Sequence, residues 1–230
     1  LILFKPMLER ELRYMSIWKG SIPMLLQLDN ISDEAVESVS YSFNALPQTE
    51  HRDGKYRLRR YSVIQCNGNC VGLGENTFIQ SDEYNKFQGN MTRSFEPIEP
   101  KTVDSIGMLE MSCMFKAACC LPDDQKIEVH QMRIITLDEE TPVSPEGVHQ
   151  DGFDYICIVG ITRYNVTGGH LLVYSDKDDE HFMSLALKPG EIAMIDDKAL
   201  WHNASNIEPV IGKDGYMDAF ILTAKVDENG

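Results

Sequence analysis

The stretch DYICIVGITRYNVTGGHLLVYSD, residues 154–176, contains two apolar runs that flank the pair Gly168-Gly169. Both runs have the length of a β-strand and are far shorter than the roughly 20 apolar residues of a membrane-spanning helix. Two adjacent glycines between such runs are typical of a turn. The stretch therefore predicts two β-strands joined by a tight connection.

The same pattern continues on both sides of this stretch, from residue 126 to the end of the chain. Short apolar segments alternate with turn signals such as KDDE and Pro189-Gly190. Regularly spaced strands with turns between them are typical of a sandwich or barrel. We therefore expect a mainly β fold with flanking helices, whose core is a double-stranded β-helix, or jelly roll. Further strands are expected in KIEVHQMRIITL (126–137), FMSLALK (182–188), EIAMIDD (191–197), WHNASNI (201–207) and AFILTAKV (219–226).

The N-terminal half of the chain has helical spacing in two places. In SDEAVESVSYSF, residues 32–43, Ser32 is suited to cap a helix and acidic residues follow in the first turn. SIGMLEMSCMFKAACCL, residues 105–121, has helical spacing and is ended by LPDD. Between them, HRDGKYRLRRYSVIQC, residues 51–66, alternates as a strand does.

Length and composition indicate one domain that acts on small molecules. The chain has 230 residues, and 43% of them are apolar, which is enough for a sizeable core. Because no linker is visible, we expect a single domain over 1–230, with 1–121 packed on the outside of a jelly-roll core at 122–230. The net charge of −15 repels polyanions, so neither a nucleic acid nor an anionic membrane is expected as a partner. The sequence does not indicate an oligomeric state.

The N-terminal sequence and the cysteines favour a reduced, cytoplasmic protein. LILFKPMLER lacks the apolar length and the cleavage site of a signal peptide. Most cysteines lie in apolar surroundings, as small buried hydrophobes do. Cys66 and Cys70, in the turn-rich CNGNC, offer a disulfide or half a metal site, but we expect a chance pair of thiols.

Three residues in the C-terminal half are suited to bind one metal ion. His149 and Asp151, in GVHQDGFDY, are two positions apart and would share one face of a strand. His202 would come from a distant strand, after the turn PGE, the apolar run IAMID and a short loop. Two imidazoles and one carboxylate on one face of an ion form the facial triad of non-haem Fe(II) oxygenases, and leave the other face for a co-substrate and O₂. A His-X-Asp pair alone also occurs as a surface salt bridge, so it is the order of the surrounding strands that favours the metal site.

These segments resemble a known family. PEGVHQDGFDYICIVGITRYNVTGGHLLVYSD, PGEIAMIDDKALWHNASNIEP and HRDGKYRLRRY are similar to stretches of the bacterial isoleucine dioxygenase-like Fe(II)/2-oxoglutarate oxygenases, over residues 45–225. The resemblance implies Fe(II), 2-oxoglutarate and O₂ as cofactors, and His149, Asp151 and His202 as catalytic iron ligands. It also implies oxidation of an aliphatic C–H bond in a free, branched-chain L-amino acid, most simply by hydroxylation. Desaturation or oxidative cyclisation of the amino acid are the alternatives within the same chemistry.

One position departs from the family pattern. The resemblance places an Arg for the distal carboxylate of 2-oxoglutarate where this chain has Met217. We expect Arg163, or Gln131 together with Arg133 on one face of their strand, to hold the co-substrate instead. Loss of that Arg also favours a rival, a cupin-like metalloenzyme that does not use 2-oxoglutarate. A second rival is a small-acid-binding relic of this fold, although the intact triad argues against it. A zinc hydrolase is a further rival, although no motif supplies its general base.

An amino-acid substrate needs a partner for its carboxylate, a partner for its ammonium group and an apolar pocket. Each candidate taken alone is also explained as a solvated charge or as a core residue. For the carboxylate we expect Arg59, which shares a strand face with Arg57, and Arg93. For the ammonium group we expect Glu128, with Asp154 as the alternative. His130 is expected as a further contact, and Phe153 and Phe220 for the apolar part.

Overall fold

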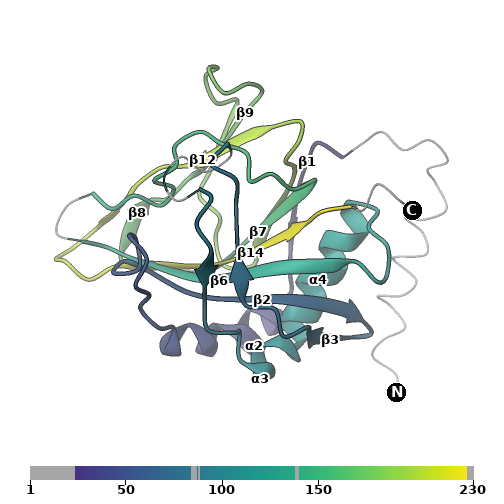
Figure 1. The fold of residues 1–230 in the computed structure, drawn as a ribbon. Helices are drawn as coiled ribbons and strands as arrows, with labels where there is room; N and C mark the ends of the chain where they lie inside the picture. The colour runs from purple at the N-terminus through teal and green to yellow at the C-terminus, as the bar shows by residue number, and fades with distance from the viewer. Residues whose placement is uncertain (1–23, 84–86, 88, 138–139, 227–230) are drawn as a thin grey trace.

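The computed structural model describes residues 24–83, 87, 89–137 and 140–226, and its largest element is a seven-stranded antiparallel sheet (Figure 1). The expected N-terminal region before residue 24 lies outside the described residues. Segments far apart in sequence are neighbours in this sheet, because its first and last strands come from the N-terminal half and its centre from the C-terminal half. The strands, in spatial order, are β1 (Leu26–Asn30), β11 (Glu191–Asp196), β7 (Tyr155–Tyr164), β14 (Tyr216–Ala224), β6 (Lys126–Ile135), β2 (Arg57–Asn67) and β3 (Asn69–Gly72).

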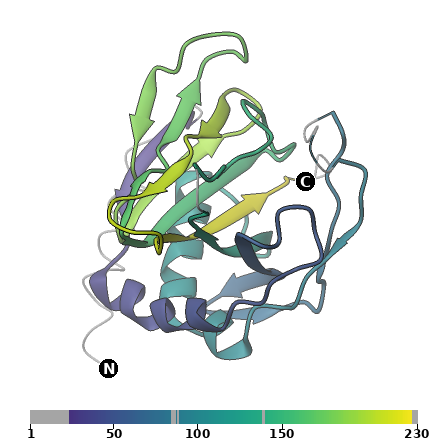
Figure 2. The same cartoon turned by 90° about the vertical axis from the view of Figure 1, so that its left-hand side faces the viewer.

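A smaller sheet faces the large one and completes the jelly roll that the sequence predicts (Figure 2). An apolar cluster that includes Ile156, Val173 and Ile195 joins the two layers. The strands of the smaller sheet are β10 (Met183–Leu185), β9 (Leu171–Tyr174) and β12 (Trp201–Ala204). Two further strand pairs are β13 (Ile207–Pro209) with β8 (Val166–Gly168), and β4 (Thr77–Phe78) with β5 (Arg93–Ser94).

The stretch at 154–176 forms strands on both sides of its glycines, but its first run is broken. Asn165 has φ of 50°, and its side-chain amide donates to the carbonyls of Ile211 and Asp214. The chain therefore turns there and divides the expected single strand into β7 and β8. Gly168 has φ of +76°, and a Cβ on it would lie 2.0 Å from the carbonyl oxygen of Asn206. Only glycine fits at this crossing, which brings the chain back as β9.

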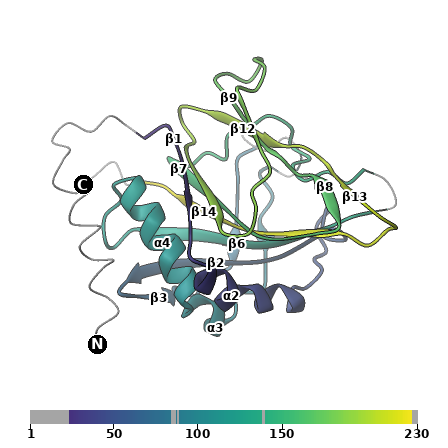
Figure 3. The ribbon, with the colours of Figure 1, turned by 180° about the vertical axis from the view of Figure 1, so that it is seen from behind.

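Helices cover the face of the large sheet that points away from the smaller one (Figure 3). Their starts follow from local sequence, since the hydroxyl of Ser32 accepts a hydrogen bond from Ala35 N and that of Ser105 from Met108 N. Apolar side chains of these helices, such as Phe115, pack on sheet residues such as Val159 in one large core. The helical elements are α2 (Asp33–Ser40), the 3-10 helix η1 (Tyr41–Ala45), α3 (Pro100–Val103) and α4 (Ile106–Ala118).

The prediction of a chance pair of thiols is wrong, because Cys66 and Cys70 form a disulfide. The two cysteines are direct partners across the β2–β3 hairpin, with Asn67 opposite Asn69 and Gly68 at the turn. Such a tight hairpin brings the two Cα atoms to 4.1 Å. No helix among the described residues is long and apolar enough to cross a membrane.

Candidate metal centre and its cavity

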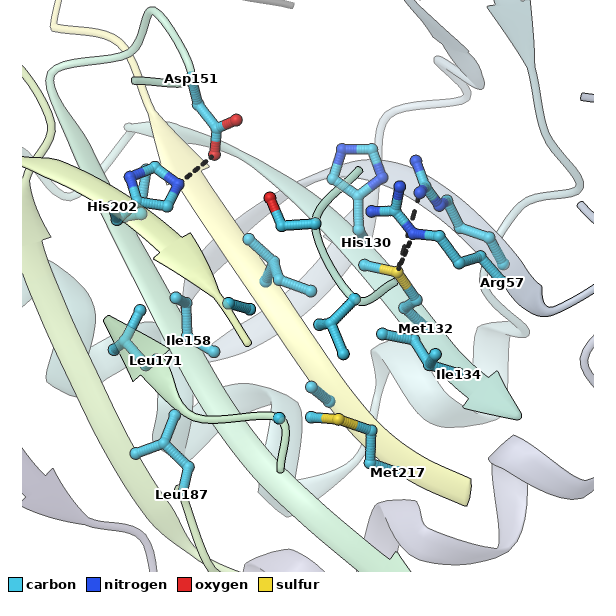
Figure 4. A pocket seen from close by; sticks show the side chains of 18 of the residues that line it. Arg57, His130, Met132, Ile134, Asp151, Ile158, Leu171, Leu187, His202 and Met217 are labelled. Atoms are coloured by element: carbon cyan, nitrogen blue, oxygen red, sulfur yellow. Dashed lines mark hydrogen bonds and ion pairs between the residues drawn. The ribbon is translucent and has the colours of Figure 1, made fainter. Parts of the chain in front are cut away.

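The side chains of His149, Asp151 and His202 lie close together. Figure 4 shows two of them, Asp151 and His202, pointing toward one another. His149 and His202 are held opposite each other by a β-bridge, in which each backbone N–H donates to the other residue's carbonyl at 2.9 Å. Asp151 follows in a loop rather than in the expected strand, and Gly152, with φ of +86°, turns the chain after it. The Nε2 atoms of His149 and His202 lie 3.4 and 3.7 Å from the Asp151 carboxylate oxygens. One ligand atom from each residue lies within 4.8 Å of the others, so the three can hold one metal ion.

Hydrogen bonds and charge prepare these side chains for a cation. The Nδ1–H of His149 donates to the carbonyl of Gly147 at 2.8 Å, which directs the lone pair of Nε2 toward Asp151. Burial lowers the pKa of His149, but the hydrogen bond and the charge of Asp151 outweigh it and raise this pKa to about 9. Burial would raise the pKa of Asp151, yet the two imidazoles hold it well below its usual value. The carboxylate thus attracts positive charge, which a metal ion would supply in place of a proton.

Asp197 is a buried carboxylate that contacts the loop carrying Asp151. Its carboxylate accepts hydrogen bonds from the backbone N–H groups of Asp151, Gly152 and Phe153, the shortest at 2.9 Å. Its Oδ1 also lies 3.5 Å from Nδ1 of His202. Burial and repulsion from Asp151 raise the pKa of Asp197 to about 7. One buried side chain therefore holds the loop that carries Asp151 by hydrogen bonds and lies beside the imidazole of His202.

We expect an Asp197→Asn protein to bind divalent metal about 10- to 100-fold more weakly, as is usual when a partner of the ligands is lost. The amide would turn a donor toward N–H groups that need an acceptor. Titration of the apoprotein with Co(II) against a competing chelator measures the change. Asp196→Asn is the matched control, because the carboxylate of Asp196 accepts hydrogen bonds from the backbone N–H groups of Lys198 and Ala199 in its own turn. Equal affinity in both variants would contradict the role of Asp197.

The triad opens into a cavity of about 170 Å³ between the two sheets. In Figure 4, Asp151 and His202 lie on one side of it, and His130 and Arg57 lie on the other. Its far end is apolar, and it is lined there by residues that include Ile158, Leu171, Leu187, Met217 and Ile134. The cavity thus combines a metal position, a cationic wall and an apolar end.

The cationic wall is the side of the cavity where arginine side chains outnumber the carboxylates that contact them. Arg57 and Arg59 project from the same face of β2, and Arg93 reaches the cavity from β5. Asp53 lies 2.8 Å from Arg57 and 3.7 Å from Arg59, and Glu146 lies 3.6 Å from Arg57. Three guanidinium groups therefore face two carboxylates, apart from Asp151 at the metal position. Burial and the neighbouring Arg57 lower the pKa of Arg59 to about 9, which leaves Arg59 charged at neutral pH, and they also lower the pKa of Arg93. The cluster can accept one more negative charge.

Arg163 lies beside Met217, the position at which the family pattern is broken. The two residues are register partners on β7 and β14, and both line the cavity. Nη2 of Arg163 donates to the carbonyl of Gly168, whereas its buried Nη1 has no hydrogen-bond partner within the described residues. An unpaired N–H on a buried cation is costly, so this guanidinium is suited to an anion in the cavity.

Five of the expected binding residues line the cavity: Arg59, Arg93, His130, Phe153 and Arg163. His130 is packed between the rings of Tyr61 and Phe78, at centroid distances of 4.8 and 4.7 Å. Burial and the nearby arginines lower its pKa well below the usual value, so its imidazole is neutral. The cavity therefore brings together candidates for the co-substrate and for the substrate.

Two expected co-substrate residues are not brought to the cavity. Gln131 points to the helix-covered face of the sheet, where its amide donates to Ser42 at 2.6 Å. Arg133 is paired with Asp218 at 2.6 and 2.8 Å, and its guanidinium lies over the ring of Tyr216. Successive side chains of a strand point to opposite faces. Because His130, Met132 and Ile134 of β6 face the cavity, Gln131 and Arg133 point away from it.

Two expected substrate residues also lie elsewhere. Phe220 packs edge to face on Phe43, at 5.0 Å between ring centroids, in the core beneath the helices. Glu128 is on the face of β6 that carries His130, but lies one step beyond the cavity and accepts a hydrogen bond from the Tyr61 hydroxyl at 2.6 Å. Neither residue is in contact with the cavity that the structure forms.

Several cavity residues were not expected from sequence: Phe78, Gln80, Met132 and Glu146. Arg57, which alternates with Arg59 in RLRRY, lines the cavity as well. Gln80 and Glu146 lie in irregular segments, and nothing in their local sequence indicates the cavity. Asp197 had one weak signal, its place directly after an apolar strand.

The family model for 2OG-Fe dioxygenases matches residues 40–223. The chain belongs to this family. It is a non-haem iron dioxygenase that uses Fe(II), 2-oxoglutarate and O₂, and the His-Asp-His cluster supplies the metal site that such an enzyme needs. No protein with a curated description matches the sequence.

Solved structures share the fold of this oxygenase. A bsmA homolog from Methylobium petroleophilum PM1 is 24% identical, with a TM-score of 0.72, over 83% of this chain and 81% of that one. IDO from Bacillus thuringiensis is 16% identical, with a TM-score of 0.70, over 96% of this chain and 99% of that one. The Fe(II)/(alpha)ketoglutarate-dependent dioxygenase TqaL is 11% identical, with a TM-score of 0.61, over 98% of this chain and 89% of that one.

Proposed function

We propose that this oxygenase oxidises an aliphatic C–H bond of a free L-amino acid, with hydroxylation of a branched-chain substrate as the main reaction. The observation that carries the proposal is the arginine cluster with Glu146 inside the cavity that also holds the triad. A net positive wall next to one carboxylate suits a small zwitterion. The likeness of the sequence to isoleucine dioxygenase-like enzymes supports the same substrate class.

His149, Asp151 and His202 would hold the iron. Their donor set fits Fe(II), and their ligand atoms already lie close together. When bound, iron and 2-oxoglutarate convert O₂ into an oxidant that removes hydrogen from an aliphatic carbon, with release of succinate and CO₂. The protein's own residues fix the geometry, since Gly147 orients the His149 ring and Asp197 holds the loop of Asp151.

Arg163 would bind the distal carboxylate of 2-oxoglutarate. Its unpartnered Nη1 fits an anion, and its place beside Met217 explains how the cavity can dispense with an Arg at position 217. Leu171 and Leu187 line the same part of the cavity and would exclude water from the carbon chain of the co-substrate. This arrangement supports a 2-oxoglutarate enzyme over a cupin-like enzyme without that co-substrate.

The substrate would be held by its two charged groups. Arg59 and Arg93 would bind its carboxylate, because these two guanidinium groups are the less neutralised members of the cluster. Glu146 takes the role that the sequence assigned to Glu128, since it is the acid that lines this wall. Met132 and Phe153 would contact the aliphatic side chain. Substrate radicals formed beside the iron could also lead to desaturation or ring closure, and product analysis decides between these outcomes.

Anaerobic titration with Fe(II) and 2-oxoglutarate tests the cofactor sites through the visible charge-transfer band of the chelate. Succinate release with a panel of L-amino acids, followed by mass spectrometry of the products, then tests the substrate. A product that has gained one oxygen atom identifies hydroxylation. Absence of turnover with every amino acid, in a protein that forms the chelate band, would refute the proposed substrate class.

A Glu146→Gln protein should reverse the preference between an amino acid and its deaminated analogue. Loss of a charged hydrogen-bond partner costs about 1.5–3 kcal/mol, or roughly a 10- to 150-fold rise in KM for the amino acid. The deaminated acid should bind no worse, because the remaining cluster is more positive. Steady-state succinate assays with both compounds measure the ratio, and Glu128→Gln is the control outside the cavity. An equal rise in KM for both compounds would exclude Glu146 as the ammonium partner.

A further inference from the structure

Gln80 connects the arginine cluster to the metal centre. It follows β4, is 7% exposed and lines the cavity. Its Nε2 donates both to the backbone carbonyl and to Oδ1 of Asp151, each at 3.0 Å. Its Oε1 accepts from Nη2 of Arg93 at 3.5 Å. A single amide therefore contacts a metal ligand on one side and a substrate-binding cation on the other.

The contact with Asp151 limits how this carboxylate can meet a metal ion. Oδ1 is hydrogen-bonded to Gln80 and faces His149, whereas Oδ2 faces His202. A second hydrogen bond to the backbone carbonyl fixes the amide itself, so Gln80 opposes rotation of the Asp151 side chain. A carboxylate held in this way would keep its orientation toward a metal ion bound by the triad.

The contact with Arg93 is long and can change. A distance of 3.5 Å is at the outer limit of a hydrogen bond. Arg93 is placed by the ring of Phe78, its cross-strand neighbour, at 4.8 Å from its guanidinium carbon. Its buried Nε has no hydrogen-bond partner within the part of the chain that the structure describes. A carboxylate bound to Arg93 would therefore change the hydrogen bond that this guanidinium donates to Gln80.

We propose that Gln80 is a positioning residue that couples occupation of the arginine cluster to the orientation of Asp151. A carboxylate at Arg93 acts through the Gln80 amide on the metal ligand, so that the metal centre differs between the substrate-bound and the substrate-free protein. The identity of the ligand at Arg93 rests on the proposed function, whereas the link from Gln80 to Asp151 does not. The coupling is reciprocal, so metal binding changes affinity at Arg93 by the same factor.

The test uses the Co(II)-substituted protein, whose visible spectrum reports the ligand geometry without turnover. Spectra and Co(II) affinity are measured with and without L-isoleucine, and with acetate as a probe that carries a carboxylate alone. In the parent protein we expect either ligand to change the spectrum and to shift Co(II) affinity several-fold. Gln80→Leu and Gln80→Glu, which both remove the donor to Asp151, should abolish that shift. Gln65→Leu should retain it, because the amide of this β2 residue donates to the backbone carbonyl of Asp124 instead.

The outcomes separate this inference from the proposed function. Loss of the shift in both Gln80 variants, with the fold intact by circular dichroism, supports the inference. A parental shift in either Gln80 variant overturns it, and so does a parent protein that responds to neither probe. A response to acetate that survives Arg93→Met would mean direct binding of acetate to cobalt, and also overturns it. A response to acetate that needs Arg93, without any response to amino acids, would uphold the coupling and refute the amino-acid substrate.

Discussion

An Asp151→Ala protein is expected to lose iron-dependent succinate formation almost completely. Asp151 is the one carboxylate among the three clustered candidate ligands, and it would balance the charge of a divalent ion held between the two imidazoles. Without it the site keeps two neutral donors and loses several kcal/mol of metal-dependent stabilisation, which corresponds to a fall of about 1000-fold or more in rate. Metal analysis after dialysis and an assay of succinate release measure the two parts of the effect.

The control for this experiment is an aspartate outside the cavity. Asp176→Ala alters an exposed residue in the loop after β9 and should leave both metal content and rate unchanged. His149→Ala and His202→Ala should resemble Asp151→Ala in metal content. An Asp151→Ala protein that turned over at the parental rate would show that the triad is not the iron site.

The second large effect concerns the co-substrate. An Arg163→Met protein should bind 2-oxoglutarate at least about 30-fold more weakly, because loss of one partner of a buried charged pair costs about 2–5 kcal/mol. The double variant Arg163→Met/Met217→Arg should regain much of the affinity, since the two positions are register partners on adjacent strands that border Gly169. Anaerobic titration of the chelate band gives the affinity without turnover.

An Arg133→Met protein tests which of the two candidate arginines, Arg133 or Arg163, binds 2-oxoglutarate. Arg133 is bonded to Asp218 and is not among the residues that line the cavity, so this change should lower stability but not the affinity for 2-oxoglutarate. If Arg133→Met weakened 2-oxoglutarate binding while Arg163→Met did not, the co-substrate would belong to Arg133. Failure of the double variant alone would show that the guanidinium cannot reach the same point from β14.

Local sequence was sufficient for much of the fold because its signals act over a few residues. The cap at Ser32, the strands of the jelly roll and the turn at Gly168 all depend on neighbours in the chain. The sequence prediction of the triad assumed that His149 and Asp151 share one face of a strand, and the structure brings them together in another way. His149 and Asp151 do not share a strand face, but a β-bridge to His202 and a turn at Gly152 bring them together.

Other parts of the site depend on registers that no local pattern specifies. The spacing of β6 showed that Gln131 and Arg133 share one face, but not which face meets the helices. Gln80 and Asp151 are 71 positions apart in sequence, and only the fold makes them partners. Cys66 and Cys70 are close in sequence, yet their pairing required the exact pairing of β2 with β3 to be known.

The side chains of β6 alternate between the cavity and the helix-covered core, and this has a consequence for altering the substrate selectivity of the enzyme. Val129 and Gln131 pack toward the helices, whereas Met132 and Ile134 on the same strand face the cavity. Substitutions at these two positions alter the shape offered to a ligand and leave the helix-packed core intact. A mutant library confined to such positions can therefore vary selectivity with little loss of folded protein. Evolution could use the same separation, with substrate range diverging along one side of a sheet whose other side keeps the fold.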